Sequence, residues 1–141
     1  MQMGRQKVEV EHRYDATPEA VWAVYVDHAR WSEWSGFGGS RLIKPGTPDL
    51  NGVGAIRGFV GRTREEIMSF DPPKRMTYRL IGGLLPIKNH LGEVIFEADG
   101  SGTLVRWRCH FDSWVPGLGG PIQRMITGMF DRALTGLEGQ V

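Results

Sequence analysis

The sequence has only one cysteine, Cys109, among its 141 residues. A single thiol excludes an internal disulfide and a zinc site built from cysteines alone, and it favours a reducing compartment. No stretch approaches the roughly 18 consecutive apolar residues that a membrane-spanning helix needs. The opening segment, MQMGRQKVEVEH, alternates charged residues with valine and has no apolar core of the signal-peptide type. These absences predict a cytoplasmic protein without stable membrane insertion.

The sequence also lacks an excess of charge of either sign. Seventeen Lys and Arg residues face sixteen Asp and Glu residues, which gives a net charge of +1. This balance cannot supply the counterion release that drives nucleic-acid binding, so we expect no nucleic-acid partner. A hydrophobic content of 40% is typical of a globular protein, and the length suits one domain over residues 1–141.

Motifs for common cofactors are missing as well. The chain contains no HExxH zinc motif, no glycine-rich phosphate loop, no dinucleotide fingerprint and no GxSxG nucleophile elbow. The four histidines, His12, His28, His90 and His110, show no spacing typical of metal ligands. We therefore expect no cofactor and no metal.

The two ends of the chain have recognisable patterns. A strand and two short helices are predicted near the N-terminus, and a longer helix is predicted near the C-terminus. Lys7 to Tyr14 alternate between apolar and charged residues, which predicts a half-buried strand. Thr17 and Pro18 are typical of a helix cap and a first helical residue, and a second short helix carrying Trp31 and Trp34 is expected to follow. Near the C-terminus, Pro121 opens the strongest helical pattern, whose apolar residues are Ile122, Met125, Ile126, Met129, Phe130, Ala133, Leu134 and Leu137.

Between these helices the sequence predicts a series of strands joined by short turns. Glycine and proline mark the turns, which makes neighbouring strands antiparallel. The order is therefore one strand, two helices, six strands and one helix, with no internal repeat and no linker. The six predicted strands span residues 38–44, 53–60, 63–70, 75–82, 88–98 and 103–112.

Several segments in this order resemble one known superfamily. They are ATPEAVW at 16–22, ARWSEW at 29–34, DPPKRMTYR at 71–79 and LGEVIFEADGSGTLVRW at 91–107. With this layout the chain resembles the START-like helix-grip superfamily (SRPBCC), which includes polyketide cyclases and dehydrases, lipid-transfer domains and Bet v 1-type proteins. The resemblance implies an α+β fold: a seven-stranded antiparallel sheet curved around a long C-terminal helix, two short helices after the first strand, and an internal cavity. The pattern itself favours such a hollow, because one helix is narrower than the sheet it covers.

Strand alternation indicates which polar residues face the interior. His90 is in phase with the apolar residues of its strand, and its ordinary pKa near 6.5 suits proton transfer at neutral pH. Glu65 and Glu66 are adjacent, so one of them must face inward, and Arg57 on the preceding strand is the natural partner. Tyr78 is also in an inward phase. Each has an ordinary alternative: a histidine at the cavity rim, a structural ion pair, or a tyrosine bonded to the backbone.

The connector GGLLPI at 82–87 is apolar and rich in glycine, which suits the edge of a cavity or a contact with a partner. The longer segment IGGLLPIKNH resembles the loop that closes over ligand in plant hormone receptors of the same superfamily, although Leu84-Leu85-Pro86 replaces the polar tip. The best catalytic candidates are His90 and Glu65. The predicted ligand-binding set is Tyr14, Trp34, Arg57, Glu65, Tyr78, Leu84, Leu85, His90, Trp107, Met125 and Met129.

Three functions remain open on the sequence. The first is binding of a hydrophobic or aromatic small molecule, lipid-like or polyketide-like, which requires a cavity of a few hundred Å³. The second is a cyclase- or dehydratase-like enzyme in which His90, with Glu65, Arg57 or Tyr78, handles protons. The third is an interaction module in which the 82–87 loop forms a homodimer contact.

Overall fold

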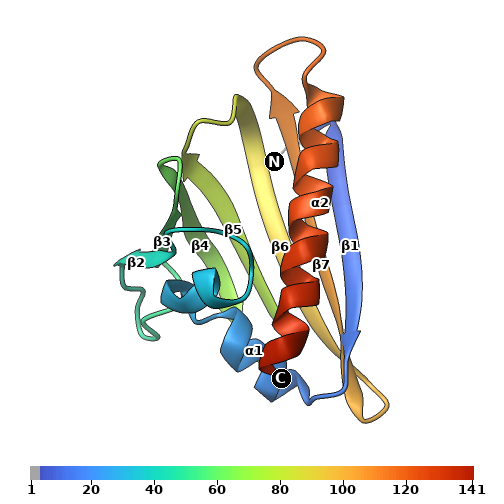
Figure 1. Cartoon of the computed structure of the whole chain (residues 1–141). Coiled ribbons are helices and arrows are strands. Elements are labelled where there is room, and N and C mark those ends of the chain that lie inside the picture. Colours follow the sequence, from blue (N-terminus) through green and yellow to red (C-terminus); the bar gives the residue numbers. More distant parts are fainter. Residues whose placement is uncertain (1–3) are drawn as a thin grey trace.

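Seven antiparallel strands form one sheet behind a single long helix in the computed structural model, which describes residues 4–141 (Figure 1). The strand order is β1-β7-β6-β5-β4-β3-β2, so the first and last strands of the sequence are neighbours. The predicted helix-grip fold is therefore confirmed. The strands are β1 (Gln6–Tyr14), β2 (Arg41–Lys44), β3 (Ile56–Phe59), β4 (Thr63–Asp71), β5 (Arg75–Gly82), β6 (Ile87–Asp99) and β7 (Gly102–Ser113).

The two short helices follow β1 as predicted. Helix α1 (Pro18–Tyr25) begins where the Thr17 side chain accepts a hydrogen bond from the Ala20 amide at 3.3 Å. The short 3-10 helix η1 (His28–Glu33) follows at once. The two lie on the same side of the sheet as the long helix and cover only a portion of the area that it leaves open (Figure 1).

Two strands are shorter than the sequence pattern predicts. The segments expected over 38–44 and 53–60 contain only β2 and β3. The residues between them form turns instead. The Gly46 amide donates a hydrogen bond to the Leu50 carbonyl oxygen at 2.8 Å, and the Gly52 amide donates to the Asp49 carbonyl oxygen at 2.9 Å. Gly54 adopts a left-handed backbone with φ of 86°, which ends the turn and delays the strand.

The long helix α2 spans Gly119–Leu137 and begins two residues before the proline that was expected to open it. The predicted apolar stripe faces the sheet, except that Met125 is 44% exposed. At about 100° per residue, Met125 falls at the edge of the stripe, where the helix turns toward solvent. The buried members are Ile122, Ile126, Phe130, Ala133, Leu134 and Leu137.

Large aromatic side chains occupy much of the space between the sheet and α2. Trp107 on β7 stacks on Phe130 of α2 with ring centroids 3.7 Å apart. Tyr25 from α1 meets Trp31 and Trp107 edge to face, at 5.0 and 5.7 Å. This packing leaves little room for a cavity.

Candidate functional site

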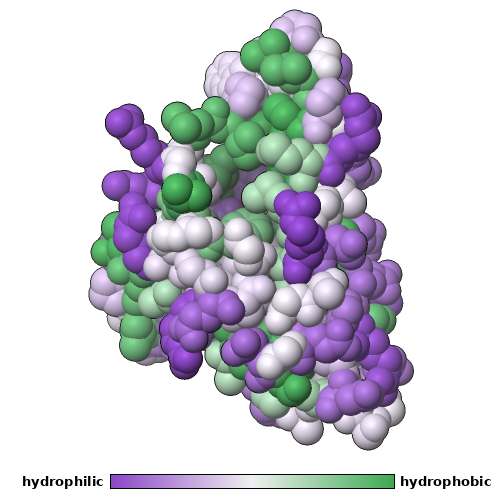
Figure 2. Space-filling view, in the orientation of Figure 1, coloured by the Kyte–Doolittle hydropathy of each residue, from purple (hydrophilic) through white to green (hydrophobic). Residues whose placement is uncertain are grey.

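The cavity that remains between the sheet and α2 has a volume of about 180 Å³. Figure 2 shows a hollow with a mostly hydrophobic rim beside α2. Its polar lining consists of Thr63, Glu65, Tyr78 and His90. Such a concave, mainly apolar space with a few polar groups is typical of a small-molecule site. The other residues that line it are Gly36, Phe37, Gly38, Phe59, Val60, Leu80, Leu85, Ile87, Ile126, Met129 and Phe130.

This volume is below the few hundred Å³ that we expected for a carrier. Ligand pockets commonly measure roughly 300 to 1,000 Å³, whereas an apolar cavity of about 150 Å³ accommodates one benzene ring. The aromatic packing described above is the physical reason for the difference. The space therefore suits a ligand with one ring or a similarly small apolar body.

Arg57 and Glu65 form an ion pair at the inner wall of the cavity. The two residues are direct partners in the register of β3 and β4, and Arg57 Nε lies 2.8 Å from Glu65 Oε1. The Arg57 side chain is fully buried, with its guanidinium 4.4 Å from the Trp31 ring centre and 4.6 Å from that of Tyr78. Burial raises the pKa of the Glu65 carboxyl, and the charge of Arg57 limits that rise. The pair predicted from the sequence is thus present and faces the interior.

A histidine that the sequence analysis left unassigned supports this arginine from behind. His28 is fully buried, with Nδ1 3.4 Å from Arg57 Nη1 and Nε2 2.9 Å from the Asn51 carbonyl oxygen. Burial lowers the pKa of His28 to about 3, so its ring is neutral at physiological pH. Within residues 4–141, Arg57 Nη2 and the Tyr25 hydroxyl are buried without a hydrogen-bond partner. No periodic pattern in the 3-10 helix marks His28 as a partner of Arg57.

His90 is held by a backbone amide. Its Nδ1 accepts a hydrogen bond from the Leu80 amide at 3.0 Å, beside a register shift in β6. Burial lowers the pKa of His90 to about 4, and the neighbouring His110 and Arg57 act in the same direction. Because Nδ1 accepts a hydrogen, the neutral ring carries its own proton on Nε2. His90 therefore offers the cavity a hydrogen-bond donor.

Tyr78 forms a wall of the cavity, and Trp107 supports that wall. Trp107 Nε1 donates to the Tyr78 hydroxyl oxygen at 2.7 Å. Burial raises the pKa of Tyr78 well above its ordinary value, so the hydroxyl stays protonated. Trp107 itself is 1% exposed and lies behind the cavity lining rather than in it.

Of the predicted ligand-binding residues, the structure brings Glu65, Tyr78, Leu85, His90 and Met129 together around one cavity. Arg57 and Trp107 contact members of this lining from behind.

Four of the predicted residues lie away from this cavity, which corrects their placement. The Tyr14 hydroxyl donates to the Leu134 carbonyl at 2.5 Å and fastens β1 to the end of α2. Trp34 is packed into the aromatic cluster at the end of η1. Leu84 is 75% exposed, because the two leucines of the 82–87 loop point to opposite sides. Met125 is turned to solvent by the helical phase of α2.

Part of the apolar lining was not predicted from the sequence. Phe37 enters the cavity from the segment after η1, where Gly36 has a left-handed φ of 82°. Phe130 lines it from α2, although helical spacing identified it only as a core residue. An aromatic residue between two glycines was the available signal for Phe37.

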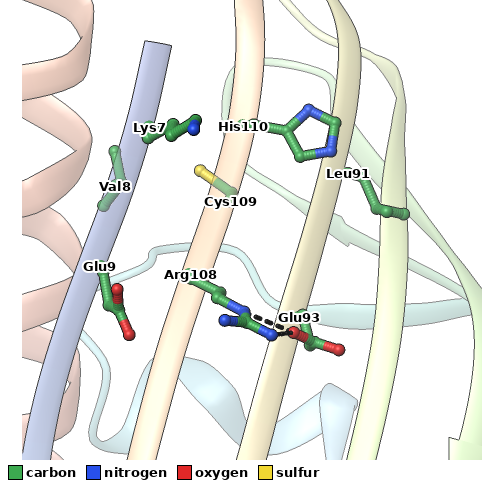
Figure 3. Close-up of a pocket in the computed structure, with 8 residues that line it drawn as sticks. All are labelled: Lys7, Val8, Glu9, Leu91, Glu93, Arg108, Cys109 and His110. Carbon is green, nitrogen blue, oxygen red and sulfur yellow. Dashed lines mark hydrogen bonds and ion pairs between the residues drawn. The ribbon is translucent and has the colours of Figure 1, made fainter. Parts of the chain in front are cut away.

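A second hollow, of about 480 Å³, lies on the opposite face of the sheet, across β1, β7 and β6 (Figure 3). Figure 3 shows Arg108 turned toward Glu93 there, and Arg75 pairs with the same carboxylate. Burial opposes the shift, but these hydrogen bonds lower the pKa of Glu93. Ion pairs flank this groove, whose lining combines charged residues with Val8, Leu91 and Cys109. Its lining residues are Lys7, Val8, Glu9, Leu91, Glu93, Arg108, Cys109 and His110.

The part of the chain that the structure describes shows neither a cluster of metal-ligating side chains nor a helix able to span a membrane. Among residues 4–141, no group of three or more His, Cys, Asp and Glu side chains is placed to hold a metal ion. None of the helices there combines the length and the apolar character that crossing a bilayer requires.

Comparison with known structures gives the same fold. A START superfamily protein from Mycobacterium smegmatis matches with a TM-score of 0.79 at 11% identity, over 96% of this chain and 97% of that one. A protein from Thermobifida fusca matches with a TM-score of 0.78 at 21% identity, over 94% and 90%. The structure of Ara h 8.0201 matches with a TM-score of 0.67 at 12% identity, over 94% and 97%. At these identities the similarity shows the fold alone.

The comparison of sequences identifies the family. None of the curated protein sequences compared with this chain matches it significantly. The sequence profile described as "Polyketide cyclase / dehydrase and lipid transport" matches residues 5–141, nearly the whole chain. The chain therefore belongs to the polyketide cyclase/dehydrase and lipid transport family.

Proposed function

We propose that the protein binds a small hydrophobic or aromatic molecule in the cavity between the sheet and α2. The observation that carries this proposal is the mainly apolar lining of the cavity, which includes a few polar groups, among them Glu65 and His90. Burial of apolar ligand surface provides the affinity, and the polar groups orient the ligand. The volume of about 180 Å³ favours a one-ring ligand over a long-chain lipid.

The alternative of a cyclase- or dehydratase-like enzyme has weaker support. A general base needs a free nitrogen toward the substrate, but the His90 ring has Nδ1 occupied by the Leu80 amide. Glu65 is the remaining candidate, and one of its oxygens is held by Arg57. A binding protein needs neither residue to exchange protons, so the binding function accounts for the geometry with fewer demands.

Association of two copies is a second candidate, favoured by the exposed apolar residues beside the cavity mouth. Leu84, between β5 and β6, is 75% exposed, and Val60, between β3 and β4, is 71% exposed. A Leu84→Ser variant would abolish concentration-dependent association in analytical ultracentrifugation if this contact forms. A wild-type protein that stays monomeric at all concentrations would rule the contact out.

We also propose a cytoplasmic location, which the single cysteine supports.

The binding function is tested by filling the cavity from α2. In Met129→Trp the larger side chain occupies the space that Met129 lines, whereas Met125→Trp places the same change on the exposed side of the helix. Isothermal titration with toluene should give binding to the wild type and to Met125→Trp, and none to Met129→Trp. Equal binding to both variants would show that the ligand lies elsewhere.

A further inference from the structure

The two polar groups at the inner end of the cavity lie on either side of one strand. Glu65 on β4 is the register partner of Leu80 on β5, and the Leu80 amide bonds to His90 on β6. The Tyr78 ring on β5 lies near both groups: its centre is 5.6 Å from the His90 ring centre and 4.6 Å from the guanidinium of Arg57, the partner of Glu65. Glu65 and His90 both line the cavity together with Tyr78, so a polar group of a ligand bound there can reach either side chain.

These groups offer one acceptor and one donor. Glu65 Oε1 accepts from Arg57 Nε, and its second oxygen makes no hydrogen bond within residues 4–141. An ionised carboxylate can only accept hydrogen bonds. The His90 ring, with Nδ1 bonded to a backbone amide, presents Nε2–H, which can only donate. A hydroxyl group is the smallest group that donates to the first and accepts from the second.

The charge at this end is already balanced. Arg57 is fully buried and Glu65 is its carboxylate partner, so the pair is neutral as a unit. A carboxylate on the ligand would place a second negative charge against Glu65 in a poorly solvated site. A cationic ligand would meet the buried Arg57 charge in the same way. A neutral polar group avoids both costs.

We infer that the ligand is a neutral one-ring aromatic alcohol of the phenol class, whose hydroxyl donates to Glu65 and accepts from His90 while its ring occupies the apolar part of the cavity. This inference rests on the proposed binding function, and it adds the chemical class of the ligand. It assigns Glu65 and His90 as the residues that select the hydroxyl, and Phe37, Phe130 and Met129 as the walls around the ring.

The test is isothermal titration of the wild-type protein at neutral pH with four probes of similar size: 4-methylphenol, 4-methylanisole, toluene and 4-methylbenzoate. We expect 4-methylphenol to bind at least about tenfold more tightly than toluene, because it adds hydrogen bonds to a charged acceptor. The anisole can accept but cannot donate, so it should lose most of this gain. The benzoate should bind least.

Two variants then locate the selectivity. Glu65→Gln keeps the shape and can still accept from Arg57, and His90→Phe removes the donor. In each variant the affinity for 4-methylphenol should fall close to the affinity of that same variant for toluene, so the ratio of the two affinities approaches one. A variant that fails to fold leaves the comparison of the four probes on the wild type as the deciding measurement.

The outcomes separate the two proposals. Equal affinity for toluene and 4-methylphenol would overturn selection of the hydroxyl and leave the hydrophobic cavity as a binding site. Preference for 4-methylbenzoate would overturn the assigned ligand class. If none of the four probes binds, the binding function fails, and the inference fails with it.

Discussion

Replacing His90 with glutamine should remove a large part of the protein's sensitivity to mild acid. The pKa of His90 is lowered from 6.5 to about 4 in the folded protein, chiefly by burial. As pH falls below 6.5, the unfolded chain takes up a proton at this ring and the folded protein does not. Stability from a depressed histidine pKa is therefore present above pH 6.5 and is lost as pH falls toward 4.

The size of the effect follows from the shift. One pKa unit corresponds to about 1.36 kcal/mol, so the full shift of about 2.5 units corresponds to roughly 3.4 kcal/mol. Between pH 7 and pH 5 the wild type should lose about 2 kcal/mol of unfolding free energy through His90 alone. A glutamine at this position does not titrate, so the variant should lack this loss.

Urea unfolding of both proteins at pH 7, 6 and 5 measures this difference directly. Acidic side chains that titrate in both proteins cancel when the two free energies are subtracted at each pH. A His28→Gln variant should show a change of the same sign, because the pKa of His28 is lowered to about 3. An identical pH dependence in the wild type and His90→Gln would refute the assignment of a buried neutral ring.

Three other substitutions test contacts that hold the sheet, the ion pair and α2 in place, by urea unfolding. Gly92→Ala should cost about 2–4 kcal/mol, because the new Cβ would lie 2.2 Å from the Tyr78 ring; a cost below 0.5 kcal/mol would mean that the ring moves freely. Arg57→Leu should cost about 3–5 kcal/mol by leaving the Glu65 carboxylate buried without a partner, and adding Glu65→Leu should recover part of that loss. Tyr14→Phe should cost about 1 kcal/mol through loss of one buried hydrogen bond to α2, and unchanged stability would count against this fastening.

The cavity is small and mainly apolar, and its polar groups are held by hydrogen bonds within the protein. Its apolar walls and small volume suit retention of a compact ligand, and its polar end is built from an ion pair and a neutral histidine. The Arg57 guanidinium lies 4.4 Å from the Trp31 ring centre and 4.6 Å from the Tyr78 ring centre, and these contacts favour a fixed position for the ion pair. In the proposed binding function, groups that are fixed before the ligand arrives would provide the selectivity.

Strand and helix periodicity were sufficient for the order of the elements and for the inward direction of several side chains. Alternation along β4 and β6 predicted that a glutamate of the 65–66 pair and His90 face the interior, since a strand has a period of two residues. The pairing of Arg57 with Glu65 also followed, because a short turn brings β3 and β4 together in antiparallel register.

What the sequence by itself determined is thus the fold and the polar residues on its inner face, because both depend on local periodicity and on short turns. Only the tertiary structure decided the size of the cavity, since that depends on how aromatic rings from α1, β7 and α2 fill the same space. It also decided the role of His90. The Leu80 amide donates a hydrogen bond to Nδ1 beside a register shift in β6, and no residue pattern predicts that shift. The contact of His28 with Arg57 joins residues 29 positions apart, and only packing could place them together.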